Sequence, residues 1–291
     1  MSRIATVFLA TSLQGSSVVR ALLKDGTFTV RAVTRDVSSD SARALSGLGC
    51  QVVGATMDDK DAVSKAVAGA ECVALITLPS WKGIPELTQG INVIDASKAA
   101  GVKFISFSTL PSLRDMSNGK YTNANHFDDK AAIQKHLEAS QIPYACISPG
   151  NFLENVMPGR QPTFPFVKTE TGYLMNTPGL AGTWGPAVTA LLTQYTTRLA
   201  EINKQTFVLG SARTTAEESA AELAKGLGKP VEVKHLGKAG FPPIADMFDC
   251  SAEHDWFPNV KIPDPRLKAL GVEVGTIEEF AATVLKPSIE A

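Results

Sequence analysis

Residues 6–15, TVFLATSLQG, carry the pattern that decides the fold of this 291-residue chain. An apolar run gives way to small and polar residues and ends at Gly15, as the first strand and phosphate loop of a nucleotide-binding fold do. Leu9 and Ser12 stand where such a loop normally carries glycines, so their Cβ atoms narrow the space for a pyrophosphate. The stretch predicts a strand and a helix, joined either by a turn that still receives a phosphate or by a plain connection.

Short apolar runs alternate with helix-period segments through the first 150 residues. Repeated strand-then-helix units imply a parallel sheet with right-handed crossovers, and nearly all-apolar strands imply helices on both faces. The sequence therefore predicts an α/β fold with a doubly wound, Rossmann-type parallel sheet. We expect Gly26 to end the first helix and Asn125 to cap the last one. The predicted strands span 3–10, 29–35, 50–56, 72–78, 102–109 and 142–150, and the predicted helices 15–26, 38–49, 59–70, 85–101 and 125–140.

This rhythm breaks after residue 150, because four prolines crowd one stretch, namely Pro158, Pro162, Pro165 and Pro178. Further along, residues 204–210 are predicted to form a strand that can return to the sheet, and residues 215–228 a helix behind a capping-box threonine. We expect a dinucleotide-binding domain over residues 1–150 and a smaller α+β lobe for substrate or partner over residues 151–291.

Composition and charge exclude several classes of protein. Lysine plus arginine number 28 against 29 for aspartate plus glutamate, and no basic run gives the electrostatic footprint of direct nucleic-acid binding. No apolar stretch reaches the ~18 residues of a membrane span. The four cysteines form no paired motif and the four histidines no ligand spacing, which predicts reduced thiols in a cytoplasmic protein and no metal.

Loops after the strands are where an open α/β sheet binds its ligand. After the first strand, the hydroxyls of Thr11, Ser12 and Ser16 and the amides of the helix start can receive a phosphate. After the second strand stands Arg35, where NAD-preferring sites carry a carboxylate for the ribose. Arg35 therefore favours NADP through its 2′-phosphate, with Asp36 beside it and a solvated surface arginine as the alternative.

Four longer stretches carry a family resemblance: VFLATSLQGSSVVRALL at 7–23, VRAVTRD at 30–36, GVKFISFSTLPS at 101–112 and IPYACISPGNFLEN at 142–155. Together they resemble the NmrA-like family of atypical short-chain dehydrogenases, over nearly the whole chain. The family loop is GATGxQG, so Leu9 and Ser12 replace two of its glycines.

The resemblance implies a set of contacts with NADP, NAD being the second possibility. It implies that Thr11, Gln14 and Gly15 line the pyrophosphate, that Arg35 binds the 2′-phosphate and that Asp58 lies near the adenine. It further implies that Thr77, Leu78 and Lys130 follow the nicotinamide ribose, and that Pro149, Gly150, Asn151 and Phe152 lie beside the nicotinamide.

Lys130 matches the lysine that ordinary short-chain dehydrogenases place four residues after a catalytic tyrosine, and His126 stands at the tyrosine position. Because residues i and i+4 project from one helix face, both can point into the cleft. Similar reductases of plant phenolics use the lysine as acid or base. Either Lys130 or His126 is therefore the predicted acid, or the site binds cofactor without turnover; a solvent-facing His126 is equally compatible with the sequence.

Three functions are compatible with these residues. The first is an NADP-dependent oxidoreductase acting on a small molecule, an aromatic one among the candidates. The second is a redox-sensing regulator that binds NADP or NAD and signals to a protein partner. The third is a cofactor-independent enzyme that uses His126, Lys130 or Asp128 for acid–base work. Trp81 and residues 254–257 either wall a flat substrate or pack in the core, and the sequence predicts no oligomeric state.

Overall fold

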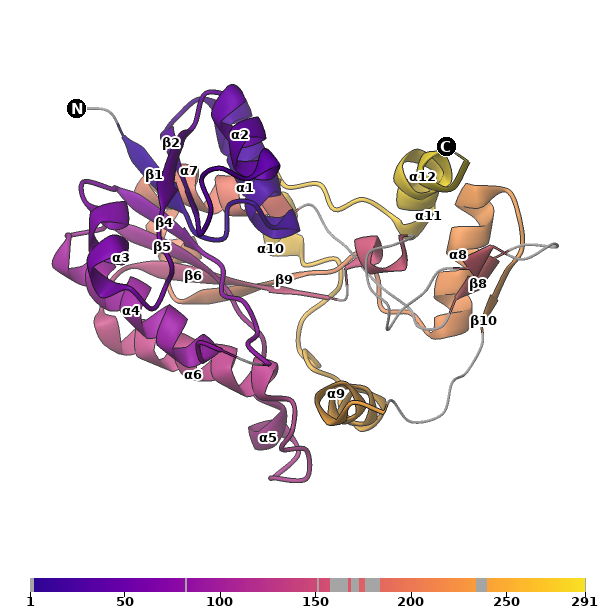
Figure 1. Cartoon of the computed structure of the whole chain (residues 1–291). Coiled ribbons are helices and arrows are strands. Elements are labelled where there is room, and N and C mark those ends of the chain that lie inside the picture. The colour runs from indigo at the N-terminus through magenta and orange to yellow at the C-terminus, as the bar shows by residue number, and fades with distance from the viewer. Residues whose placement is uncertain are drawn as a thin grey trace. The chain divides into compact units, whose positions relative to one another are not determined.

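The computed structural model describes residues 3–81, 83–150, 152–157, 167–168, 173–175, 184–233 and 240–290 (Figure 1). The chain divides into two compact units. Unit 1 comprises Met1–Ser148, Trp184–Phe207 and Pro242–Trp256, and unit 2 comprises Pro149–Thr183, Val208–Phe241 and Phe257–Ala291.

A seven-stranded sheet of order β3-β2-β1-β4-β5-β6-β9 is the centre of unit 1. Neighbouring strands from β3 to β6 pair in parallel, and the order reverses between β1 and β4. This confirms the predicted doubly wound fold. The strands are β1 Ile4–Val7, β2 Thr29–Thr34, β3 Gln51–Gly54, β4 Cys72–Leu75, β5 Phe104–Ser108, β6 Tyr144–Pro149 and β9 Gln205–Leu209. The last of them confirms the predicted return of residues 204–210 to the sheet.

Helices cover both faces of this sheet (Figure 1). On one face α1 packs against α7, and on the other α4 packs against both α3 and α6. Between that second layer and the strands lies a core that includes Leu75, Ile94, Ile105, Phe107 and Ile133. The helices of unit 1 are α1 Leu13–Asp25, α2 Asp40–Gly47, α3 Lys60–Val67, α4 Glu86–Ala99, α5 Leu113–Met116, α6 Asn125–Ser140, α7 Trp184–Ile202 and α9 Pro242–Glu253.

Local sequence explains most helix ends. Gly26 ends α1 in the left-handed conformation, φ 77°, as predicted. The prediction that Asn125 caps α6 is wrong. Asn125 is the first residue of the helix, and Ala124 occupies the capping position without a side-chain hydrogen bond. Asp128 instead stabilises the preceding turn, where its Oδ1 accepts from Ser112 Oγ at 2.9 Å and from the Arg114 amide at 3.2 Å.

A close crossing between α1 and α7 explains why residues 184–207 belong to unit 1. A Cβ on Gly185 would lie 2.3 Å from the carbonyl oxygen of Ser17, so only glycine fits there. The Gly185 amide also donates to Ser17 Oγ at 3.0 Å. This partition differs from the expected division at residue 150, because α7 and α9 supply unit 1 with packing from beyond that point.

Unit 2 has its own three-stranded sheet, β10-β8-β7, and its own core around Leu153, Leu223 and Leu285. The capping box predicted at Thr215 is confirmed, with Glu218 as its partner. Its elements are η1 Leu153–Val156, β7 Val167–Lys168, β8 Tyr173–Met175, α8 Ala216–Leu227, β10 Val231–Val233, α10 Pro265–Ala269, α11 Ile277–Phe280, η2 Ala281–Leu285 and α12 Lys286–Glu290. The proline-rich stretch predicted to be irregular lies largely outside the described residues.

None of the helices described is both long and apolar enough to cross a membrane. No group of three or more histidine, cysteine, aspartate or glutamate residues in the described part could hold a metal ion. Cys50, Cys72, Cys146 and Cys250 are all buried and unpaired in disulfides, as predicted.

Candidate functional site

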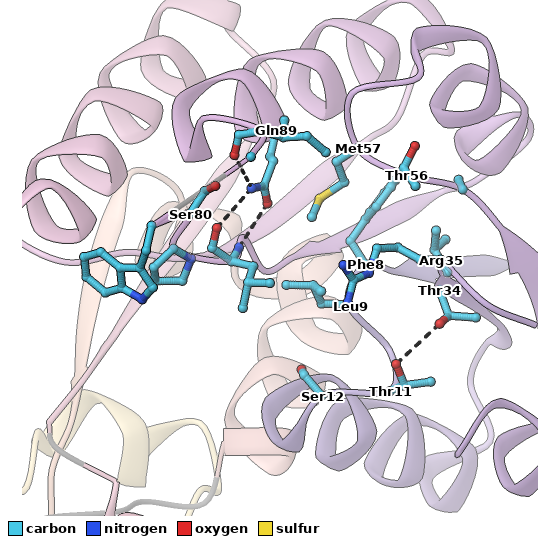
Figure 2. A pocket seen from close by; sticks show the side chains of 17 residues that line it. Phe8, Leu9, Thr11, Ser12, Thr34, Arg35, Thr56, Met57, Ser80 and Gln89 are labelled. Atoms are coloured by element: carbon cyan, nitrogen blue, oxygen red, sulfur yellow. Dashed lines mark hydrogen bonds between the residues drawn. The ribbon is translucent and has the colours of Figure 1, made fainter. Parts of the chain in front are cut away.

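A pocket of about 700 Å³ lies in unit 1 at the carboxyl ends of β1, β2 and β3 and along the segment after β4 (Figure 2). This is the edge where doubly wound sheets bind ligands. It is lined by Phe8, Leu9, Thr11, Ser12, Val33, Thr34, Arg35, Ala55, Thr56, Met57, Leu78, Pro79, Ser80, Trp81, Gly83, Ile84 and Gln89. The structure thus brings together four of the predicted residues, Thr11, Ser12, Arg35 and Leu78.

The turn after β1 keeps the backbone geometry of a glycine-bearing loop. Leu9 has φ 52°, a left-handed conformation that costs a non-glycine residue about 1–2 kcal/mol. Its carbonyl oxygen lies where a Cβ on Gly15 would be only 2.0 Å away, so glycine at 15 permits the helix to press on the turn. Leu9 and Ser12 therefore border the pocket and leave its volume open.

Several polar side chains in and after the turn that follows β1 already contact other groups of the protein. Ser12 Oγ accepts from the Gly15 amide at 3.0 Å, which caps α1 and occupies one of its first-turn donors. Thr11 Oγ1 lies 3.4 Å from Thr34 Oγ1. Gln14, predicted beside the pyrophosphate, does not line the pocket, and its Nε2 donates to Ser108 Oγ at 3.3 Å.

Among the described residues that line this pocket, Arg35 is the one with a basic side chain. It is exposed, and within the described part of the chain it has no hydrogen-bond or ion-pair partner. Asp36, by contrast, accepts from the Ser38 amide at 2.8 Å and from Ser38 Oγ at 2.6 Å. The hydroxyl of Ser38 lowers the pKa of Asp36, so this carboxylate is committed to its own turn. The guanidinium is thus available to an anion.

Two segments after β3 and β4 form the remaining walls. Thr56 and Met57 line the pocket, whereas Asp58, predicted near the adenine, is exposed and is not among the lining residues. Residues 78–81, 83 and 84 form the second wall (the 78–84 wall), with half-exposed Trp81 in it, and residue 82 lies outside the described residues. Thr77, immediately before this wall, is buried and does not line the pocket.

Lys130 does not enter this pocket. Its Nζ lies 2.6 Å from Glu86 Oε1 and donates to Thr77 Oγ1 at 2.9 Å. Only 8% of the Lys130 side chain and 1% of the Glu86 side chain are exposed. Thr77 Oγ1 in turn donates to Glu86 Oε1 at 2.6 Å. Glu86 was not predicted, because an acid in the first turn of a helix normally faces solvent and interacts with the helix dipole.

His126 also faces protein. Its ring lies 5.2 Å from Trp81 and 4.9 Å from Phe127, both in edge-to-face geometry. Burial lowers its pKa to about 4, with a further contribution from the charge of Lys130 and an opposing one from Asp128. Its Nδ1 is buried without a hydrogen-bond partner in the described part of the chain. His126 is therefore neutral at pH 7, and its ring packs against the ring of Trp81.

The residues predicted beside the nicotinamide lie mostly in unit 2. The Gly150 amide, after Pro149 at the end of β6, donates to the Leu209 carbonyl at 3.0 Å. Phe152 is partly buried and packs on the core of unit 2. Asn151 lies outside the described residues.

Comparisons with known proteins agree with this fold. An NmrA-like family domain-containing protein of Dictyostelium discoideum is 36% identical over 138 residues, which cover 47% of this chain and 45% of that protein. An NmrA-like family domain-containing oxidoreductase of Malbranchea aurantiaca is 33% identical over 196 residues, covering 62% and 57%. The chain thus spans about half the length of these curated relatives.

Solved structures resemble the whole chain. NmrA, a negative transcriptional regulator, in complex with NADP has a TM-score of 0.83 at 16% identity, over 99% of this chain and 97% of that one. Triphenylmethane reductase of Citrobacter sp. complexed with NADP(H) has a TM-score of 0.71 at 21% identity, over 96% and 98%. At these identities the likeness shows the fold. The model of the NmrA-like family matches residues 1–239, and the chain belongs to that family.

Proposed function

We propose that this protein binds NADP(H) in the pocket of unit 1 and is an oxidoreductase acting on a small molecule, with flat aromatic compounds as the first class to test. The observation that carries the proposal is Arg35, whose guanidinium has no partner among the described residues and lines a pocket at the switch point of a doubly wound sheet. Bound NADPH would supply the hydride, and the protein would hold and orient it.

The preference for NADP over NAD rests on the end of β2. A guanidinium can bind a 2′-phosphate through two charge-assisted hydrogen bonds. The neighbouring carboxylate, Asp36, is the group that could instead hold a free ribose hydroxyl, but it already accepts hydrogen bonds from Ser38. Curated relatives named as oxidoreductases, such as the protein of Malbranchea aurantiaca, support the reaction class.

A redox-sensing regulator that binds NADP or NAD without turnover is the second candidate. One observation favours it: Lys130, the predicted proton donor, lies in a buried pair with Glu86. The fold of NmrA, described as a negative transcriptional regulator, is consistent with this alternative. Under this proposal the pocket is the same and a protein partner reads its occupancy.

A cofactor-independent acid–base enzyme has less support. Each of its candidate groups is engaged: Lys130 with Glu86, His126 between two aromatic rings and Asp128 with the turn at Ser112. An acid–base catalyst must reach the proton that it transfers. None of these three side chains lines the described pocket.

Titration of NADPH and NADH by fluorescence tests the proposal. Arg35→Asp should remove the advantage of NADPH over NADH, roughly a 10- to 100-fold change in the affinity ratio, because a charge-assisted pair is lost. Arg20→Asp is the matched control, since Arg20 is an exposed arginine of α1 that does not line the pocket. No binding of either coenzyme at millimolar concentration would refute both candidates, and an unchanged ratio in Arg35→Asp would refute the role of Arg35.

Turnover separates the two candidates once binding is established. NADPH oxidation would be followed in the presence of a panel of flat aromatic acceptors, including quinones and cationic dyes. Oxidation that depends on an acceptor supports the oxidoreductase. Binding without oxidation across the panel supports the regulator.

A further inference from the structure

Helix α4 presents a buried polar face to the pocket walls. Glu86, Gln89 and Asn92 follow one another at intervals of three residues, so they share one side of the helix. They are 1%, 5% and 6% exposed. Buried polar groups need partners, and each of these three side chains finds its partner in a segment that forms or adjoins a wall of the pocket.

Gln89 forms hydrogen bonds with both ends of the 78–84 wall. Its Oε1 accepts from the Leu78 amide at 3.1 Å, and its Nε2 donates to the carbonyls of Leu78 at 3.0 Å and Ile84 at 3.3 Å. Figure 2 shows these bonds running from α4 to the wall. A side chain that bridges both ends of a loop in this way fixes its backbone.

Asn92 holds the opposite wall. Its Nδ2 donates to the carbonyl of Met57 at 2.9 Å, and Met57 lines the pocket from the end of β3. One helix face therefore sets the separation between the two walls. A flat ring that enters between them meets a gap whose width depends on α4.

Glu86 completes this arrangement at the base of the first wall. Thr77 directly precedes the wall and Glu86 follows it after Pro85, so their 2.6 Å hydrogen bond closes the segment into a loop. Lys130 contributes from α6, where its Nζ contacts both Glu86 Oε1 and Thr77 Oγ1. It also donates to the Thr77 carbonyl at 3.3 Å.

We propose that Lys130 is a positioning residue, which together with Glu86 and Thr77 anchors the 78–84 wall of the nucleotide pocket, and that it is not the proton donor of the reaction. The proposal rests on the proposed function only for the identity of the ligand. The lysine neutralises a carboxylate that would otherwise be buried alone, and its three contacts all converge on the base of the loop. Lys130 does not line the pocket, so a proton donor in that position would not contact a ligand held there.

A buried ion pair gives this proposal a distinctive test. Removing one partner leaves an uncompensated buried charge, whereas replacing both by apolar residues of similar length is often nearly neutral. Lys130→Met alone should therefore release the wall, and Lys130→Met combined with Glu86→Met should restore it. A catalytic lysine would show no such recovery of function in the double variant.

Hydrogen–deuterium exchange of the peptide covering residues 78–84, measured without ligand, is the primary readout. Lys130→Met should raise its exchange rate roughly tenfold, and the double variant should return to within about threefold of the parent. Peptides of β5 serve as the internal reference for global unfolding. Exchange at 78–84 that is unchanged in Lys130→Met, or a double variant worse than either single one, would overturn the anchor.

Thr77→Val and Ser97→Ala guard against a variant that fails to fold. Thr77→Val removes only the shared hydroxyl and should raise exchange at 78–84 by about threefold. Ser97→Ala alters a different buried hydroxyl, which lies on α4 and has no hydrogen-bond partner in the described part of the chain, and should leave exchange unchanged. If Thr77→Val behaved like Ser97→Ala, the hydroxyl would have no part in the anchor and the proposal would fail.

Nucleotide binding and turnover then provide the functional readout. Lys130→Met should weaken NADPH and NADH by the same factor, because Arg35 is untouched, and the double variant should recover both. If binding recovers in the double variant while acceptor-dependent turnover stays lost, Lys130 is a catalytic residue and the proposal is wrong. If the parent binds neither coenzyme, the proposed function fails, but the exchange experiment still decides the anchor.

Discussion

The turn after β1 and the start of α6 show opposite relations between sequence and site. The turn departs from the glycine-rich pattern of its family, yet it borders a pocket that is also lined by Arg35, an arginine without a partner in the described part of the chain. Helix α6 keeps the spaced pair predicted to be catalytic, yet Lys130 is buried against Glu86 and His126 lies between aromatic rings. A motif can thus lose its residues and keep its geometry, or keep its residues and lose their exposure.

The difference has a physical cause in the distance over which each feature is determined. The turn is set locally, because the Leu9 carbonyl accepts from the Ser12 amide at 2.9 Å and Gly15 permits the close approach of the helix. The direction of Lys130 is set by the carboxylate of Glu86, which lies on α4, the helix packed beside α6 on the same face of the sheet. Local geometry tolerates substitution at single positions, whereas a charged side chain turns towards whichever partner the fold supplies.

Gly15→Ala is the change expected to have the largest effect on this comparison. Its Cβ would lie 2.0 Å from the Leu9 carbonyl oxygen and 2.8 Å from the Ala10 Cα, both backbone atoms that cannot move aside cheaply. We expect a loss of about 3 kcal/mol or more in the free energy of unfolding, together with a loss of nucleotide binding.

Chemical denaturation with Gly47→Ala as the control measures that loss. Gly47 is the last residue of α2, and a Cβ there meets nothing within 4 Å. The control should be neutral or slightly stabilising, since alanine favours the helix. Equal effects from the two variants would mean that the turn has slack and that its geometry does not depend on Gly15.

His126→Phe tests the other side of the comparison through pH. The pKa of His126 is about 4 in the folded protein against 6.5 in the unfolded chain, so the unfolded state binds more protons between these values. Stability therefore falls as pH drops through this window, and phenylalanine removes that contribution. The free energy of unfolding of the variant minus that of the parent should therefore be about 1–2 kcal/mol more positive at pH 5 than at pH 8. Thermal unfolding at the two pH values measures it; a pH-independent difference would show that His126 is charged or exposed in the fold.

Periodicity and turn chemistry were sufficient to predict the doubly wound sheet. The alternation of apolar strands and helices, the stop at Gly26 and the capping box at Thr215 depend on neighbours in sequence, and all three are found. Helix α7 was not predicted, because residues 187–192 are all buried and give no amphipathic period. Packing against α1 through Gly185 makes it a core helix.

The candidate site was predictable only where it depends on the backbone path. Arg35 and Thr11 follow strands whose ends meet at one sheet edge, and they line the pocket as that rule implies. Glu86 and Gln89 were missed, because a helix sequence does not reveal which polar residues turn inward. Asp58 is not among the lining residues, whereas its neighbour Met57 is. Burial of polar side chains depends on tertiary packing, and this packing determines that Lys130 contacts Glu86 rather than the pocket.

Ser12→Ala tests whether the Ser12 hydroxyl, which caps α1, competes with a bound phosphate for the Gly15 amide. Loss of a serine cap costs about 1 kcal/mol in the free energy of unfolding. A diphosphate bound at the helix start would accept from the freed Gly15 amide, so saturating NADPH should shrink this deficit.

Ser39→Ala is the matched control for the cap. Ser39 caps α2 by accepting from the Ala42 amide at 3.3 Å, and it does not line the pocket. It should lose a similar free energy that saturating NADPH does not reduce. If both deficits respond equally to NADPH, the phosphates do not reach the start of α1.

Leu9→Gly and Leu9→Ala should have the smallest effect on stability, and both change the residue that replaces a family glycine in the turn after β1. Glycine relieves the left-handed backbone at φ 52° but makes the unfolded chain more flexible, so the two terms nearly cancel and stability should change by less than about 1 kcal/mol. Alanine keeps the strain and loses the packing of the leucine side chain, so it should be the less stable of the two. Both variants widen the pocket, and NADPH titration should show equal gains in affinity if the leucine side chain is what narrows it. A gain confined to glycine would mean instead that backbone freedom in the turn, rather than space, limits how closely the pyrophosphate can approach.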